Sequence, residues 1–298
     1  MFQWINRLPA GRFALLMILP SLIFLVGVIL YPFINLVLTS MSTYDQYLVP
    51  HFTGVENYRK IFNDELFWED LGRSLVYTGG SVAVFFISGF AVALSLNKIE
   101  NHIGGTAQTL LRGICLLPWA IPPVTATMMW RWSLNSQYGM VNDLLLRLGI
   151  VGEPVGWLTR STTAMIVIIL ADAWIRIPFV ALILLAGLKA IPRELYECAK
   201  IDGAHTVGQF RHITLPLLKY PMSICLALQT MFAFRTYDIL SVMTGGGPGR
   251  TTELLVKYVL DSAFKGYSFG TASAVSIVML FICFLFVAIY WKLLRLEV

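Results

Sequence analysis

Four ionisable residues lie inside long apolar stretches of this chain. Asp172 and Arg176 are spaced i, i+4 in one stretch, and Arg235 and Asp238 are spaced i, i+3 in another. Either spacing lets an acid and a base pair on one face of a helix. Because a charge at the centre of a bilayer costs about 2.5 to 3.5 kcal/mol, each residue needs a partner or a function. Two closed ion pairs in a helix bundle, a polar solute site and an ion or proton relay are all consistent with these residues.

The surrounding stretches have the length and composition of membrane spans. Of the 298 residues, 57% are hydrophobic and 13% charged, and the mean hydropathy is +0.72. A bilayer core about 30 Å thick is crossed by about 20 helical residues. The sequence therefore predicts an all-α polytopic membrane protein, a single transmembrane domain over residues 1–298 with six transmembrane helices. We expect them at about residues 13–40, 74–97, 110–132, 163–188, 221–243 and 271–294.

Basic residues indicate the orientation of these spans. Lys and Arg are concentrated near both termini and in the segments that follow the second and fourth spans, whereas the other three loops are longer and net acidic. The positive-inside rule then predicts that both termini face the cytoplasm. The first span is too long for the apolar core of a signal peptide, so we expect it to remain as a helix. The net charge of +5 reflects this topology and predicts no binding of nucleic acid.

Patterns typical of enzymes and metal sites are missing from the sequence. The four cysteines show no CxxC spacing and the four histidines are scattered, which predicts neither disulfides nor a metal site. No HExxH motif occurs, and the glycine run at residues 244–249 lacks the Lys-Ser/Thr end of a P-loop. We expect no catalytic residue, no metal and no cofactor bound by this chain.

Prolines interrupt several spans. Pro118, Pro122 and Pro123 lie in the third span, and Pro178 lies in the fourth. Each proline removes a backbone donor, which lipid tolerates only where neighbours or a water-lined cavity satisfy the freed carbonyl groups. Such breaks indicate either a substrate path or simple packing kinks, and the sequence leaves both open.

A polar, basic segment at residues 192–216 separates the fourth and fifth spans. Pro192 suits a helix start, and residues 193–201 then predict a short helix. Asp202 and Gly203 predict its end, because Gly203 can adopt a positive φ without strain. A second helical piece should follow from about His205 to His212, with Phe210, Ile213 and Leu217 as an apolar stripe that anchors it to the membrane domain.

Within this segment the residue order is Glu197, Ala199, Asp202, Gly203, Ala204, Phe210, Ile213, Leu215 and Pro216. This order closely resembles the EAA signature of binding-protein-dependent ABC importer permeases, although Cys198 stands where the family has a second alanine. In that family the segment forms coupling helices that dock on a separate ATPase. The resemblance implies that Glu197 pairs with a cation of the ATPase and that Gly203 forms the bend that fits its groove. It implies coupling roles for Ala199, Asp202, Ala204 and Phe210 as well.

From about Pro32 to the C-terminus the chain is similar to carbohydrate permeases of the maltose and glycerol-3-phosphate type, and residues 244–249 resemble their TGGGP stretch. The resemblance implies the type I ABC importer permease fold. It also implies a sugar cavity at Trp119, Pro123, Asp172, Ile175, Arg176, Gln229, Phe232, Ala233 and Thr236. The side chains at these positions differ from those of the maltose permease, because Asp172 and Arg176 are charged in this sequence. A guanidinium that binds oxyanions through two N–H groups favours a carboxylated, phosphorylated or sulfonated sugar.

The resemblance thus implies a permease subunit of an ATP-driven importer for a sugar or sugar derivative, multi-pass in the bacterial inner membrane. Its implied partners are a second homologous permease, a dimer of ATP-binding subunits that holds ATP and Mg, an extracytoplasmic solute-binding protein, the sugar and membrane lipid. An ion-coupled secondary transporter is the alternative, in which the four intramembrane charges form a relay. The sequence shows no repeated half with matching broken segments, which disfavours this alternative.

Overall fold

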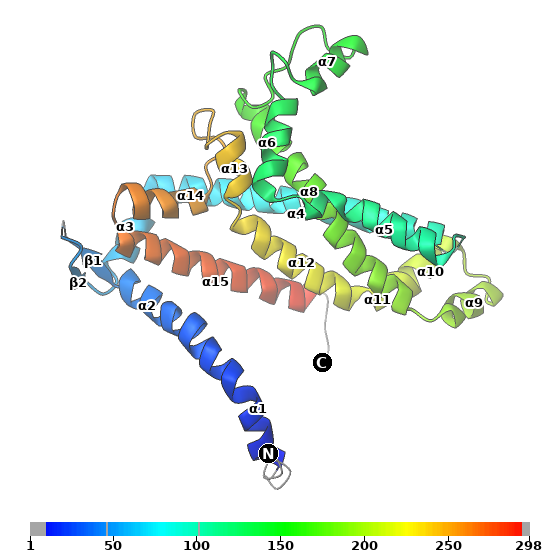
Figure 1. The fold of residues 1–298 in the computed structure, drawn as a ribbon, viewed down its shortest axis with the longest axis horizontal. Helices are drawn as coiled ribbons and strands as arrows, with labels where there is room; N and C mark the ends of the chain where they lie inside the picture. The colour runs from blue at the N-terminus through cyan, green and yellow to red at the C-terminus, as the bar shows by residue number, and fades with distance from the viewer. Residues whose placement is uncertain (1–9, 46, 101, 294–298) are drawn as a thin grey trace. The chain divides into compact units, whose positions relative to one another are not determined.

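The computed structural model describes residues 10–45, 47–100 and 102–293, and Figure 1 shows that they are helical almost throughout. The all-α prediction is therefore confirmed, with one small hairpin added. The elements are α1 (Ala10–Leu25), η2 (Val26–Leu30), α2 (Tyr31–Ser40), β1 (Ser42–Tyr44), β2 (Pro50–Phe52), α3 (Glu56–Phe62), α4 (Glu65–Glu100), α5 (Gly105–Ala120), α6 (Pro123–Ser133), α7 (Met140–Arg147), α8 (Ser161–Ala190), α9 (Arg193–Ile201), α10 (Thr206–Gln209), η3 (Phe210–Thr214), α11 (Leu215–Leu217), α12 (Lys219–Phe234), α13 (Asp238–Met243), α14 (Leu255–Leu260), η4 (Asp261–Lys265) and α15 (Phe269–Leu293), where η marks a π-helical turn. The expected end of the last span, Leu294, and both chain termini lie outside the described residues.

Four continuous helical stretches are long and apolar enough to cross a membrane. They are Ala14–Ser40, α4, α8 and α15. Two further pairs qualify as bent spans: α5 and α6 meet at 83°, and the Thr206–Leu217 stretch meets α12 at 64°. With both bent pairs the described residues hold up to six spans, which agrees with the number expected from the sequence.

The chain divides into two compact units. The first consists of Met1–Glu65 with Val259–Met279, and the second of Leu66–Tyr258 with Leu280–Val298. In the first unit the buried amide of Asn57 donates to the carbonyl oxygens of Ser40 and Ser42, at 2.9 and 2.8 Å. Because a Cβ at Gly270 would overlap the Ser42 carbonyl, only glycine lets α15 begin so close to β1.

The hairpin of this unit has a turn stabilised by a carboxylate. The Asp45 side chain accepts hydrogen bonds from the backbone N–H groups of Val49 and Tyr47, each at 2.9 Å. The hydrogen bond from Val49, with a smaller effect from that of Tyr47, favours the ionised form and holds the pKa of Asp45 below its ordinary value. The turn that joins β1 to β2 is thus fixed by a side chain within its own loop.

Helix α8 is the centre of the second unit and contacts α5, α6, α12 and α13. Apart from Asp172, Arg176 and the helix ends, its residues are apolar on every side, which is the pattern of a helix surrounded by protein and lipid. A Cβ at Gly89 of α4 would overlap the side chain of Val180, so this glycine brings α4 and α8 close together. Pro178 was expected to bend its span, but α8 continues through it without a break.

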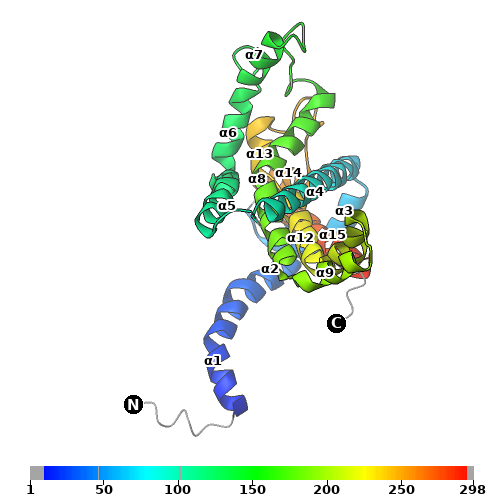
Figure 2. The same ribbon diagram turned by 90° about the vertical axis from the view of Figure 1, so that its right-hand side faces the viewer.

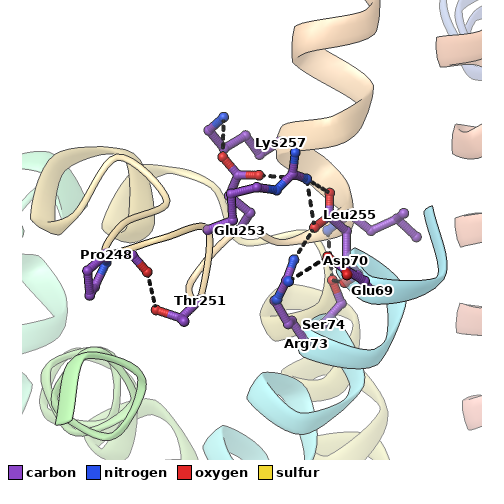
Figure 3. Close-up of polar contacts among 10 residues, drawn as sticks. Glu69, Asp70, Arg73, Ser74, Pro248, Thr251, Glu253, Leu255 and Lys257 are labelled. Carbon is purple, nitrogen blue, oxygen red and sulfur yellow. Dashed lines mark hydrogen bonds and ion pairs between the residues drawn. The ribbon is translucent and has the colours of Figure 1, made fainter. Parts of the chain in front are cut away.

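A polar network ties α4 to the segment that follows the glycine run (Figure 3). The buried carboxylate of Asp70 accepts from Arg73 at 2.7 Å and from Arg250 at 3.4 Å. Ser74 accepts from the backbone N–H of Leu255 at 2.8 Å, and Glu253 pairs with Arg250 at 2.8 Å. The chain between α13 and α14 is therefore held against the start of α4 by charge-assisted hydrogen bonds.

Candidate functional site

A cavity of about 290 Å³ lies in the second unit, where two helical stretches are interrupted. One interruption is Ile121–Pro122 between α5 and α6, and the other is Arg235–Tyr237 between α12 and α13. Figure 2 shows α6, α13 and α8 grouped together around this region. The lining residues are Trp119, Pro123, Asp172, Ile175, Arg176, Phe232, Arg235, Thr236, Tyr237, Asp238 and Ile239.

The consecutive prolines explain the first interruption. Ile121 and Pro122 both adopt extended backbone, as expected for residues that precede a proline. Pro123 then occupies the first turn of α6, where its missing N–H removes no helical hydrogen bond. The break predicted from the prolines of the third span is thus present, and it brings Trp119 and Pro123 to the cavity wall.

The ion pair that the i, i+4 spacing of Asp172 and Arg176 allows is formed in the structure. Arg176 Nε donates to one carboxylate oxygen of Asp172 at 2.7 Å, and the Tyr77 hydroxyl of α4 donates to the other at 2.8 Å. Asp172 is only 2% exposed. A buried carboxylate with a cation and a phenol as partners is satisfied without any ligand.

The rest of the Arg176 guanidinium faces the cavity. Its Nη2 donates to the Thr236 hydroxyl at 3.2 Å, and its Cζ lies 5.9 Å from the ring centroids of both Phe85 and Phe232. Within the described residues no acceptor is in hydrogen-bond reach of Nη1. Arg176 therefore ties α8 to the segment between α12 and α13. The N–H groups of its Nη1 remain available to a ligand in the cavity.

The ion pair that the i, i+3 spacing of Arg235 and Asp238 would allow is not formed in the structure. Although an i, i+3 spacing joins two residues of one helix, α12 ends at Phe234 and α13 begins at Asp238, so the two residues do not share a helix. No carboxylate in the described part of the chain is within 4 Å of Arg235. Its guanidinium lies instead over the Phe232 ring, with Cζ 5.2 Å from the centroid. Both charges are exposed and line the cavity.

Seven of the nine residues expected around the sugar line this cavity: Trp119, Pro123, Asp172, Ile175, Arg176, Phe232 and Thr236. Gln229 and Ala233 do not, because they lie on the packed face of α12, where they are 4% and 0% exposed. The sequence reasoning missed Arg235, Tyr237, Asp238 and Ile239 as lining residues. The charges of Arg235 and Asp238 are the signal that could have found this part of the lining, but their spacing is equally consistent with a closed pair on one helix.

The polar segment after α8 folds as expected into a short helix with a glycine cap. Helix α9 ends in a Schellman motif: Ala204 N–H donates to the Ala199 carbonyl at 2.8 Å, and Gly203 N–H donates to Lys200 at 3.1 Å. Gly203 has φ +77°, a conformation that only glycine adopts without cost. Ala199, Gly203 and Ala204 thus act together as the cap that turns the chain after Asp202.

The second piece of this segment is anchored on α4 by an aromatic contact. The Phe210 ring meets Phe90 edge to face, with centroids 5.8 Å apart. The stripe does not extend to Leu217, which is 49% exposed, and Leu218 is buried in its place. The π-helical turn at Phe210–Thr214 holds an extra residue per turn and rotates the register of the helical residues after it.

Beside this segment lies a cleft of about 470 Å³. Its lining is mostly polar and comes from the ends of α4 and α8 and from α9 and α10: Asn97, Leu188, Lys189, Ile191, Arg193, Tyr196, Glu197, Lys200 and Gln209. The hydroxyl groups of Tyr196 and Thr214 are 2.9 Å apart, which ties α9 to the following turn. Glu197 is exposed at this cleft, so its carboxylate is available to another protein.

A family of known proteins has this arrangement of helices. The family described as "Binding-protein-dependent transport system inner membrane component" matches residues 86–295. The chain belongs to this family. It is a permease, a multi-pass inner membrane component of an ABC importer, and the family is one of transporter subunits.

Relatives of this permease match over nearly its whole length. It is 35% identical to the sulfoquinovosyl glycerol transport system permease protein SmoG of Agrobacterium fabrum, over 98% of this chain and 94% of the relative. It is 36% identical to the trehalose/maltose transport system permease protein MalF of Thermococcus litoralis, over 95% and 93% of the two chains. A bacterial ABC transporter for import of the acidic polysaccharide alginate has a chain that superposes with a TM-score of 0.80 at 20% identity, covering 99% of this permease and 98% of that chain. The permease thus has the fold of ABC importer permeases.

Proposed function

We propose that this permease forms half of the translocation path of an ATP-driven importer for a sugar or sugar derivative. The observation that carries the proposal is the cavity at the two helix breaks, which combines an aromatic wall with polar groups. Discontinuous helices in transporters are typical of substrate sites. The names of SmoG and MalF support sugars as the substrate class.

The lining of the cavity suits a sugar. Trp119 is 52% exposed, and its ring offers an apolar face to the apolar face of a pyranose. Thr236 and Asp238 supply a hydroxyl and a carboxylate that can form hydrogen bonds with sugar hydroxyl groups. Most binding sites for small molecules combine such a surface with a few polar groups that fix the orientation of the ligand.

The capped segment after α8 is proposed as the coupling element. The nucleotide state of the ATPase would be transmitted through Glu197, Asp202 and Phe210. The shape of the segment would be fixed by the cap that Ala199, Gly203 and Ala204 form. We propose that it docks on a dimer of ATP-binding subunits, which hold the ATP and Mg. The exposed Glu197 at a cleft next to Lys200 is the contact expected to meet a basic groove.

The remaining partners follow from the proposed path. A second homologous permease would supply the other half of the cavity, and an extracytoplasmic solute-binding protein would deliver the sugar. Both termini and the coupling segment would then face the cytoplasm, as the distribution of Lys and Arg predicts. In this scheme, closure of the ATPase dimer changes which side of the membrane the cavity opens to. A ligand can shift the equilibrium between the inward-open and outward-open states only by the difference in its binding free energy for these two states.

Uptake in membrane vesicles tests the proposal. Inside-out vesicles cannot receive the binding protein correctly, so right-side-out vesicles or proteoliposomes with enclosed ATP are required. Sugar uptake that depends on ATP and on the solute-binding protein supports the importer. Uptake that persists on an ion gradient alone, without ATP, would support the ion-coupled alternative and contradict the proposal.

A further inference from the structure

Arg235 is an intramembrane cation whose charge the described part of the chain leaves unneutralised. It is exposed and lines the cavity, and its Cζ lies 5.2 Å from the centroid of the Phe232 ring. A cation–π contact at an exposed site stabilises a guanidinium by less than the free energy that placing an arginine in a bilayer costs. A ligand that supplies negative charge would offset the remainder.

Four charged residues line the cavity, but they are not equally available to a ligand. The two carboxylate oxygens of Asp172 are bound to Arg176 and Tyr77, and the residue is 2% exposed. A ligand therefore meets the open edge of Arg176, the whole guanidinium of Arg235, and the carboxylate of Asp238. The accessible surface carries more positive than negative charge, although the formal charges of the four residues cancel.

The two guanidinium groups share one aromatic support. The Cζ atoms of Arg176 and Arg235 lie 5.9 and 5.2 Å from the centroid of the same Phe232 ring. Arg176 is held in place by Asp172 and Thr236. Arg235 follows the end of α12, and within the described residues its guanidinium has no hydrogen-bonded or ion-paired partner and lies over the Phe232 ring. Arg235 thus retains all its N–H donors for a planar or tetrahedral oxyanion, which guanidinium binds through paired hydrogen bonds.

We propose that Arg235 binds an acidic group of the transported sugar, a carboxylate, sulfonate or phosphate ester, inside this cavity. Arg176 is then a positioning residue that keeps Asp172 neutralised and adds one N–H edge, and Asp238 accepts hydrogen bonds from sugar hydroxyl groups. This inference rests on the proposed function, because it names the substrate class of the same cavity. It moves the role of anion recognition from Arg176, where the sequence had placed it, to Arg235.

Matched probes can test this in proteoliposomes that contain the complete transporter, its solute-binding protein and enclosed ATP. The probes are methyl glucoside, methyl glucuronide and methyl 6-deoxy-6-sulfoglucoside, which differ only at carbon 6. Wild type is expected to import at least one acidic probe faster than the neutral probe. Arg235→Gln should lower acidic uptake at least tenfold and change neutral uptake less than threefold, because only the acidic probes lose a charged partner.

Two further variants serve as controls. Arg235→Lys keeps the charge and should recover part of the acidic uptake. Arg147→Gln alters an exposed arginine of α7 that is 77% exposed and pairs with Asp143 outside the cavity, and should match wild type with every probe. The affinity of the separate solute-binding protein for each probe, measured by calorimetry, shows which probes are delivered, and only those are compared.

The outcomes separate the inference from the proposed function. Import of the neutral probe alone, or acidic uptake by Arg235→Gln at the wild-type rate, overturns the anion role of Arg235 while leaving a sugar importer. If no sugar of either kind enters in an ATP-dependent manner, the proposed function itself fails. Should Arg235→Gln not reach the membrane, the wild-type ratio of acidic to neutral uptake and the Arg235→Lys variant still decide the question.

Discussion

The hydroxyl of Tyr77 donates a 2.8 Å hydrogen bond to Asp172, which lies 95 positions further along the chain. The bond joins α4 to α8 beneath the cavity and completes the hydrogen bonding of a carboxylate that Arg176 already neutralises. Asp172 is thereby part of the architecture of the site, and the exposed charges of Arg235 and Asp238 are the ones left to meet a solute.

Tyr77→Phe is expected to destabilise the permease. The substitution keeps the buried ring but removes the donor to Asp172, and an unsatisfied buried acceptor costs about 1 to 3 kcal/mol. The measurement is thermal unfolding of the purified transporter in detergent. Tyr138→Phe is the matched control, because Tyr138 is 59% exposed and its loss of a hydroxyl should leave the melting temperature unchanged. Equal melting temperatures for Tyr77→Phe and wild type would show that water replaces the phenol.

Gly203→Val is expected to disturb the coupling segment through its backbone. A Cβ at this position meets no atom within 4 Å, so the effect cannot come from a clash, but φ of +77° costs a residue with a side chain about 1 to 2 kcal/mol. The ATPase activity of the assembled transporter should lose its stimulation by the loaded binding protein. Gly208→Ala, inside α10 and equally free of neighbours, should behave as wild type; comparable losses in both variants would argue against a role of the positive φ.

Glu197→Ala is expected to lower ATP-dependent uptake at least tenfold without changing the stability of the isolated permease. Glu197 is exposed at the cleft, so its removal costs the fold nothing while it deletes the contact proposed for the ATPase. Glu194→Ala alters another exposed carboxylate of α9 that does not line the cleft and is the control. Uptake that falls equally in both variants would indicate a general effect of charge on α9.

Replacement of both Arg73 and Arg250 by Gln is expected to destabilise the polar network of Figure 3. Asp70 would remain as a buried carboxylate that has lost both cations, and removal of the partners of a buried charge typically costs about 3 to 5 kcal/mol. The measurement is the rate of limited proteolysis between α13 and α14, which should rise when this segment is no longer held against α4. Adding Asp70→Asn to the double variant should restore resistance, since a neutral amide needs no cation; continued cleavage would show that the arginines act by another route.

Local chemistry made much of this protein predictable. Spans such as residues 163–188 are recognisable because crossing a bilayer requires a long apolar helix, whatever the rest of the chain does. The α9 cap was equally predictable, since Gly203 and its neighbours form it through hydrogen bonds only a few residues apart. The ion pair of Asp172 and Arg176 is a contact within one helix and followed from spacing.

Interactions between distant segments were beyond such reasoning. The i, i+3 spacing of Arg235 and Asp238 has meaning only in a continuous helix, and the chain unwinds between them. Gln229 and Ala233 share a helical face with Phe232 in projection, yet the packing of α12 buries them away from the cavity.

The sequence by itself determined the membrane class, the helical spans and the capped segment at residues 192–216, because these depend on hydrophobic length and on hydrogen bonds between near neighbours. Only the tertiary structure decided which charges are neutralised and which face a cavity. The hydrogen bonding of Asp172 is completed by Tyr77 from another helix. An ion pair of Arg235 with Asp238 would have required a continuous helix, whereas α12 ends at Phe234.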